Sequence, residues 1–178
     1  SYTPYRGFEK ALKSDQEIAD DMKTIAQISR KVRTYAIADA KHVLENVKDT
    51  KLKVDVGLWL STDKNANESE LETLFELTKV YGPRISSIIV GNEVLLRADL
   101  TPEELFEYID RVSVRTRIPV TTAEVQHVWL NNTELANHVD FICVHILPYW
   151  EKVPIERTLA FTKEKYDNEV CDKEGDWK

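Results

Sequence analysis

One carboxylate in this chain directly follows a strongly apolar segment. Residues 87–91 read Ser-Ile-Ile-Val-Gly, and Asn92 and Glu93 come next. Apolar surroundings favour the protonated form of a carboxyl group, and a protonated carboxyl group can give its proton to a leaving alcohol. An adjacent amide such as Asn92 could hydrogen-bond a sugar hydroxyl. The pair therefore indicates glycoside chemistry, with Glu93 as the general acid.

Further polar and aromatic residues recur at the ends of successive apolar segments. They are Arg33, Tyr35, Trp59, Glu124, His145 and Tyr149. Aromatic rings of the kind found at Tyr35, Trp59, Tyr149 and Trp150 can stack on pyranose rings through their apolar faces. Each residue taken alone has a plainer reading, as a capped strand end or a satisfied core group. Their recurrence over five segments favours a shared site.

The elements that must position these residues alternate between strand and helix. We expect strands over 1–5, 32–38, 52–60, 85–94, 119–125 and 141–147, and helices over 15–29, 40–47, 67–81, 134–138 and 154–166. A further helix starts at 101 and includes Leu105, Ile109 and Val112. Capping boxes at Ser14 with Glu17 and at Thr101 with Glu104 mark two helix starts, and Asn67 with Glu70 marks a third. Such alternation predicts parallel strands joined by crossover helices.

Two α/β architectures fit this order. A (β/α)₈ TIM-type barrel needs about 250 residues and eight units, whereas this chain has 178 residues and about six units. A complete six-stranded doubly wound sheet is the alternative. In 52–60 the even positions are all apolar, while the odd positions are Lys53, Asp55, Gly57 and Trp59. A barrel interior tolerates that mixed face better. We therefore predict one incomplete barrel domain over 1–178, truncated at its C-terminal side.

Composition excludes several other functions. Thirty-one acidic residues against 24 basic ones leave a net charge of −7, which disfavours nucleic acid as a partner. No apolar run is long enough for a membrane helix, so we expect a soluble chain with no membrane segment. Two cysteines exclude a disulfide-dense scaffold. We expect no cofactor and no metal: Glu124, His127, His138 and His145 lie close in sequence, but Glu124 and His127 would face opposite sides of a strand.

At the level of longer motifs the chain resembles family 17 glycoside hydrolases, most of all their bacterial and fungal β-1,3-glucanase and glucanosyltransferase branch. The resemblance runs in register from residue 1 to about 167. It is carried by SYTPYR at 1–6, IVGNEVLLR at 89–97, TAEVQHVW at 122–129 and VHILPYW at 144–150.

This resemblance implies a retaining mechanism on a (β/α)₈ barrel, with β-1,3-glucan as substrate and an extracytoplasmic location in the periplasm, the cell wall or the medium. Glu93 matches the acid/base at the end of the fourth strand. We expect six residues to bind substrate: Tyr35, Trp59, Asn92, Glu124, His145 and Tyr149.

The sequence departs from the family at the nucleophile. Retention needs a second carboxylate about 5 to 5.5 Å from the first. In the family it belongs to a Gly-Glu-x-Gly-Trp-Pro type motif after the helix matched here by 154–166, and this motif is absent. Glu169 and Glu174 echo only fragments of it, and Glu124 is the other candidate considered. Two hypotheses follow: a β-1,3-glucan hydrolase or transglycosylase domain, or a non-catalytic glucan-binding remnant.

Overall fold

The computed structural model describes residues 1–7 and 11–167. Its main sheet has five parallel strands in the order β3-β4-β5-β6-β7. These are Lys31–Arg33, Lys53–Leu58, Ile85–Asn92, Val120–Val125 and Cys143–His145. Spatial order equals chain order throughout. A doubly wound sheet would reverse its order at one point, so the uninterrupted order is that of a barrel wall.

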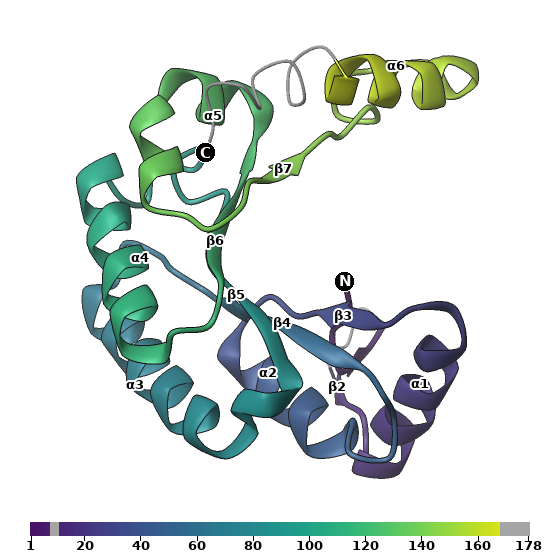
Figure 1. The fold of residues 1–178 in the computed structure, drawn as a ribbon. Helices are drawn as coiled ribbons and strands as arrows, with labels where there is room; N and C mark the ends of the chain where they lie inside the picture. Colours follow the sequence, from purple (N-terminus) through teal and green to yellow (C-terminus); the bar gives the residue numbers. More distant parts are fainter. Residues whose placement is uncertain (8–10, 168–178) are drawn as a thin grey trace.

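Helices cover the outer side of this curved wall, and the opposite side of the sheet is open (Figure 1). The α-helices are α1 Asp15–Ile28, α2 Ile37–Asn46, α3 Lys64–Tyr81, α4 Pro102–Thr116, α5 Gln126–Asn131 and α6 Thr158–Lys165. Short 3₁₀ helices span Gly82–Arg84, Thr133–Asn137 and Ile155–Arg157. In the described part of the chain, every helix is too short or too polar to cross a membrane.

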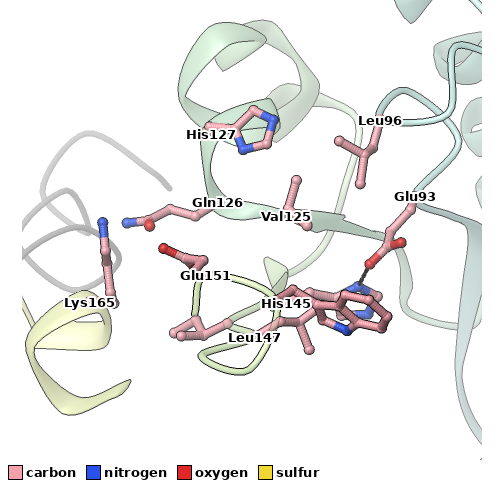
Figure 2. A pocket seen from close by; sticks show the side chains of 11 residues that line it. Glu93, Leu96, Val125, Gln126, His127, His145, Leu147, Glu151 and Lys165 are labelled. Carbon is pink, nitrogen blue, oxygen red and sulfur yellow. Dashed lines mark hydrogen bonds and ion pairs between the residues drawn. The ribbon is translucent and has the colours of Figure 1, made fainter. Parts of the chain in front are cut away.

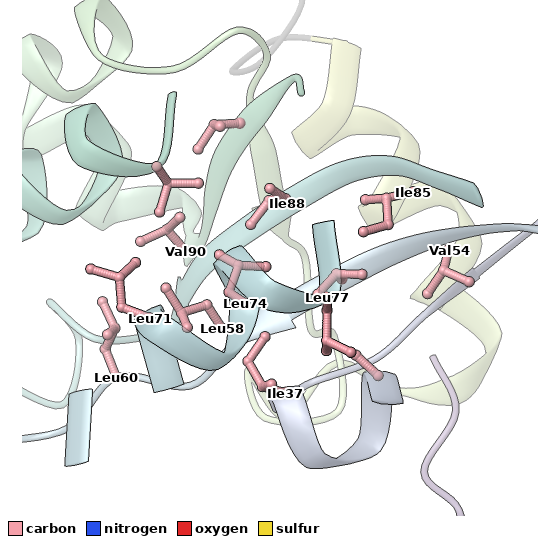
Figure 3. Packing of buried hydrophobic residues seen from close by; sticks show 14 of the residues in the cluster. Ile37, Val54, Leu58, Leu60, Leu71, Leu74, Leu77, Ile85, Ile88 and Val90 are labelled. Carbon is pink, nitrogen blue, oxygen red and sulfur yellow. The ribbon is translucent and has the colours of Figure 1, made fainter. Parts of the chain in front are cut away.

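The core lies between the sheet and α2, α3 and α4. Every even position from 52 to 60 is buried, at 0 or 1% exposure. Figure 3 shows Leu58 and Leu60 beside the α3 residues Leu71 and Leu74, and Val54 belongs to the same buried cluster. The odd positions meet the other side, where Asp55 accepts hydrogen bonds from two serine hydroxyls and Trp59 is 40% exposed. The alternation predicted for this strand is therefore confirmed.

Two of the three predicted helix starts are confirmed. Ser14 and Thr101 both form capping boxes. The third prediction is wrong, because α3 begins earlier, with Asp63 as its N-cap. Asn67 is buried and bonds Ser61 through both ends of its amide: Oδ1 accepts from the Ser61 N–H at 2.9 Å, and Nδ2 donates to the Ser61 carbonyl at 2.8 Å. This residue fixes the loop after β4 instead.

Other departures lie at the ends of the wall. The segment 1–5, predicted as a strand, meets the main sheet through a backbone bond from the Tyr2 N–H to the Arg33 carbonyl at 2.8 Å. Tyr5–Arg6 (β1) pairs antiparallel with Ala11–Leu12 (β2). The strand predicted over 32–38 ends at Arg33, because α2 already begins at Ile37, whose N–H is bonded by the Glu70 carboxylate from α3. The predicted helix over 134–138 is a 3₁₀ turn, and α5 precedes it.

Gly57 is the point where β4 approaches the chain after β3 most closely. A Cβ atom there would lie 2.5 Å from the carbonyl oxygens of Thr34 and Tyr35. Since backbone atoms cannot yield as a flexible side chain does, we expect Gly57→Ala to lower the free energy of unfolding by about 3 kcal/mol, at the upper end of overpacking costs.

Urea unfolding followed by circular dichroism measures this loss. Gly82→Ala is the matched control, because Gly82 has helical dihedral angles and open space around its Cα. There we expect no loss, or a gain of up to about 1 kcal/mol. Equal effects at the two glycines would contradict the close contact of β4 with residues 34 and 35.

Candidate active site

Glu93 follows the last residue of β5 in a strained turn. Its φ is 56°, a left-handed value uncommon for a residue with a side chain, and Gly91 before it has φ 82°. The Glu93 N–H donates to the Ala123 carbonyl of β6 at 2.7 Å, and the Glu93 carbonyl accepts from the Arg97 N–H at 2.9 Å. Such strain at a chemically competent residue is typical of functional sites. The surrounding hydrogen bonds hold this conformation.

A chain of side-chain contacts crosses the inner face from β3 to β7. Arg33 donates through Nη2 to Asn92 Oδ1 at 2.7 Å, and its Nη1 lies 3.3 Å from His145 Nε2. His145 Nδ1 lies 2.6 Å from Glu93 Oε1 (Figure 2). Guanidinium nitrogens only donate, so Nε2 must accept and the ring proton sits on Nδ1. His145 then donates its Nδ1–H to Oε1 of Glu93 and fixes the direction of that side chain.

Glu93 and His145 lie on the wall of a cavity of about 500 Å³. This volume falls within the usual range of small-molecule sites. Figure 2 shows the side chains that line it. The full lining consists of Glu93, Leu96, Val125, Gln126, His127, His145, Ile146, Leu147, Trp150, Glu151 and Lys165. Glu93 and Glu151 are the carboxylates of this lining among the described residues, and Glu151 lies toward Lys165, away from Glu93.

Glu124 belongs to β6 and is completely buried. Its Oε1 accepts the Leu95 N–H at 2.8 Å, and Oε2 has no hydrogen-bond partner among the residues the structure describes. Burial raises the pKa of Glu124 to about 7, with a further upward contribution from the charge of Glu93. The N–H groups of Leu95 and Leu96 and the charge of Arg97 act in the opposite direction. A carboxyl group so enclosed is placed to support the turn at Glu93 rather than to meet a sugar.

The predicted aromatic residues lie in different settings. Tyr35 is partly buried with the Arg33 guanidinium 5.2 Å from its ring centre, and the Arg97 guanidinium lies 4.7 Å from the ring centre of Trp59. Tyr149 and Trp150 are 83% and 75% exposed and form an edge-to-face pair at 5.4 Å. Of these four, the structure places Trp150 on the cavity wall beside Glu93 and His145.

Sequence reasoning missed part of the cavity wall. Gln126 and His127 follow β6 directly, and their place after a buried strand was the available signal. His127 and His145 both line the cavity, whereas His138 stacks on Phe106 at 4.3 Å and bonds Asp110 at 2.9 Å. The described residues contain no group of three or more potential metal ligands. Glu169, Cys171 and Glu174 lie outside the described residues.

The chain is similar to known proteins in sequence and in fold. Residues 1–174 match the family model described as the BtgE/BtgC glycoside hydrolase domain. The chain belongs to this family. A β-1,3-glucanosyltransferase of glycoside hydrolase family 17 from Rhizomucor miehei has the same fold, with a TM-score of 0.82 and 24% identity over 93% of this chain and 64% of that one. The family 17 resemblance and the incomplete (β/α)₈ fold predicted from the sequence are both confirmed.

Curated relatives are distant and longer. A probable glucan endo-1,3-β-glucosidase of Aspergillus terreus is 25% identical over 94% of this chain and 28% of its own length. A glucan 1,3-β-glucosidase of Schizosaccharomyces pombe is 28% identical over 74% of this chain and 45% of its own length. The chain thus spans between about a quarter and a half of these family members.

The buried carboxyl of Glu124 makes stability depend on pH. A pKa near 7 in the folded state, against an ordinary value of 4.5, means that the folded chain binds this proton more tightly than the unfolded chain. Its stability contribution is complete below about pH 4.5 and is lost as pH rises through 7. Between pH 4 and pH 8 the unchanged protein should therefore lose about 3 kcal/mol of unfolding free energy that the Glu124→Gln variant does not lose.

Urea titrations across this pH range measure the difference between the two proteins. Glu134→Gln is the control, since Glu134 is exposed, and its curve should run parallel to that of the unchanged protein. A constant difference between Glu124→Gln and the unchanged protein at all pH values would contradict the burial argument.

Proposed function

We propose that this chain processes β-1,3-glucan as part of a retaining glycoside hydrolase or transglycosylase, with Glu93 as the general acid/base. The observation that carries the proposal is the placement of Glu93: it follows β5 in a strained turn, is held by His145 at 2.6 Å, and opens onto the cavity. Membership of the glycoside hydrolase family and the glucanase names of the relatives support the substrate class.

In the first step the protonated Glu93 gives its proton to the glycosidic oxygen as the bond from that oxygen to the anomeric carbon breaks. A second carboxylate takes the glycosyl group as an ester. In the second step Glu93 removes a proton from water or from an acceptor sugar, whose oxygen displaces that ester. The chemistry of Glu93 is the same for both acceptors. We assign the second carboxylate to no described residue, because Glu124 is buried and Glu151 lies away from Glu93.

Around Glu93 we propose a substrate cleft. Asn92, fixed by Arg33, is placed to bond a sugar hydroxyl, and His145 faces the cavity. Tyr35, Trp59 and Tyr149 offer ring faces for stacking. The net charge of −7 suits a neutral polysaccharide and disfavours nucleic acid. An extracytoplasmic site of action, in the periplasm, the cell wall or the medium, accords with a polymeric glucan substrate.

A second function is favoured by a specific observation. Trp59, Tyr149 and Trp150 are 40%, 83% and 75% exposed, so three large rings are available to sugars without any chemistry. The alternative is therefore a glucan-binding module that holds oligosaccharide without cleaving it. Turnover and binding must be measured separately to distinguish the two functions.

We expect Glu93→Gln to reduce the release of reducing sugar and of transfer products from laminari-oligosaccharides by about 10²- to 10⁴-fold, the usual contribution of a general acid. Glutamine keeps the shape of the side chain but cannot give or take the proton. Glu134→Gln serves as the exposed control and should keep full activity. Equal turnover by Glu93→Gln and the unchanged chain would overturn the assignment. Saturable binding without turnover by either protein would support the binding module.

For Trp59→Ala we expect the Kd for laminari-oligosaccharides to rise about tenfold, through loss of an aromatic stacking face. Isothermal titration calorimetry on the Glu93→Gln background measures binding free of turnover. Val114→Ala, on the outer surface of α4 and 81% exposed, is the control. An unchanged Kd in the Trp59 variant would remove this ring from the cleft.

A further inference from the structure

The pairing of β5 with β6 shifts its register just before the turn that carries Glu93. Ile89 pairs with Thr121, and the next pair is Asn92 with Ala123, so β5 contains one residue more than β6 over this stretch. Gly91 in this bulge has φ 82°. A bulge bends its strand and redirects the side chains beyond it. The direction of Glu93 therefore depends on the hydrogen bonds that hold the chain after the bulge to β6.

Two adjacent residues of β6 accept these hydrogen bonds. The Ala123 carbonyl accepts the Glu93 N–H at 2.7 Å, and the Glu124 carboxylate accepts the Leu95 N–H at 2.8 Å. The first contact is one that any residue at 123 can make with its backbone. The second depends on the side chain at 124. Since Glu93 and Leu95 flank Val94, these two bonds hold the turn on both sides of a buried residue.

The residue type at 124 is unexpected for a purely structural bond. A glutamine could offer the same oxygen to Leu95 without the cost of burying a carboxyl group. Here the second oxygen, Oε2, is buried with no hydrogen-bond partner among the described residues, and so is Thr122 Oγ1 on the same face of β6. An ionisable group kept in this position points to a role for its charge.

We propose that Glu124 is a positioning residue, whose carboxyl group fastens the turn at 93–95 to β6 and whose charge acts on Glu93 across the two strands. This inference rests on the proposed function for its meaning in catalysis. The charged groups that act on Glu124 are Glu93 and Arg97, both on the chain after β5. On its other side, Glu124 pairs with Val144 of β7, which carries no charge.

Two variants separate the hydrogen bond between Glu124 and Leu95 from the charge of Glu124. Glu124→Gln keeps an acceptor for Leu95 and removes the charge, while Glu124→Met keeps the volume and removes both. The Leu95 amide resonance in ¹H–¹⁵N spectra reports the bond without any substrate. We expect it to titrate with a midpoint near pH 7 in the unchanged chain, to stay hydrogen-bonded but stop titrating in Glu124→Gln, and to lose its hydrogen bond in Glu124→Met.

A third variant tests the coupling between the two carboxylates. The charge of Glu93 raises the pKa of Glu124, so Glu93→Gln should move the Leu95 midpoint to lower pH. Glu134→Gln, at an exposed position, should leave it in place. An unmoved midpoint in Glu93→Gln, or a Leu95 amide that shows no hydrogen bond to residue 124, would overturn the proposal. If Glu124→Met does not fold, the Gln variants alone still decide the outcome.

Kinetic measurements then test whether the hydrogen bond between Glu124 and Leu95 matters for catalysis. We expect kcat on laminari-oligosaccharides to fall at least tenfold in Glu124→Met with KM little changed, and Glu124→Gln to recover most of the loss at a changed pH optimum. Equal kcat values in all three proteins would overturn the role in catalysis. If the unchanged chain shows no turnover while the Leu95 amide titrates as expected, the result would count against the proposed function. The hydrogen bond between Glu124 and Leu95 would still be established.

Discussion

The pairing of β5 with β6 is the contact on which the rest of this site depends. These strands are buried on the helix side by α4, and their parallel direction brings Asn92, Glu93 and Glu124 to one edge. The bulge at Gly91 then turns Glu93 toward the cavity while its N–H remains bonded to Ala123. A shift of this register by one residue would turn each side chain to the opposite face of the sheet. The core thus fixes the site.

The sequence predicts those parts of the fold that follow from local pattern. Alternating apolar residues at 52–60 gave β4 with its correct buried face, and the capping box at Thr101 gave the start of α4. The strand–helix alternation gave the barrel wall, and the apolar run before Asn92 and Glu93 gave the acid at the end of β5. In each case the deciding interaction lies within a few residues of the pattern.

The parts that were missed depend on contacts between distant residues. The cap of α2 comes from Glu70, 33 positions away, so no local pattern marks Ile37 as the helix start. Asn67 has the residue type of an N-cap but is bonded to Ser61 in the loop after β4. Arg33 meets His145 across 112 positions. Glu124 resembles a ligand-binding residue in sequence, and only the packing of β6 reveals that it is enclosed.

The contacts around Glu93 also limit how a proton can reach it. Guanidinium nitrogens only donate, so the contact from Arg33 to His145 fixes the ring but passes no proton along it. Glu124 faces the turn at Leu95 and is sealed from solvent. The open path runs through the cavity, where the Glu93 side chain is 24% exposed. Arg33 and His145 therefore orient the carboxyl group, and its proton must be exchanged on the side where a sugar would bind.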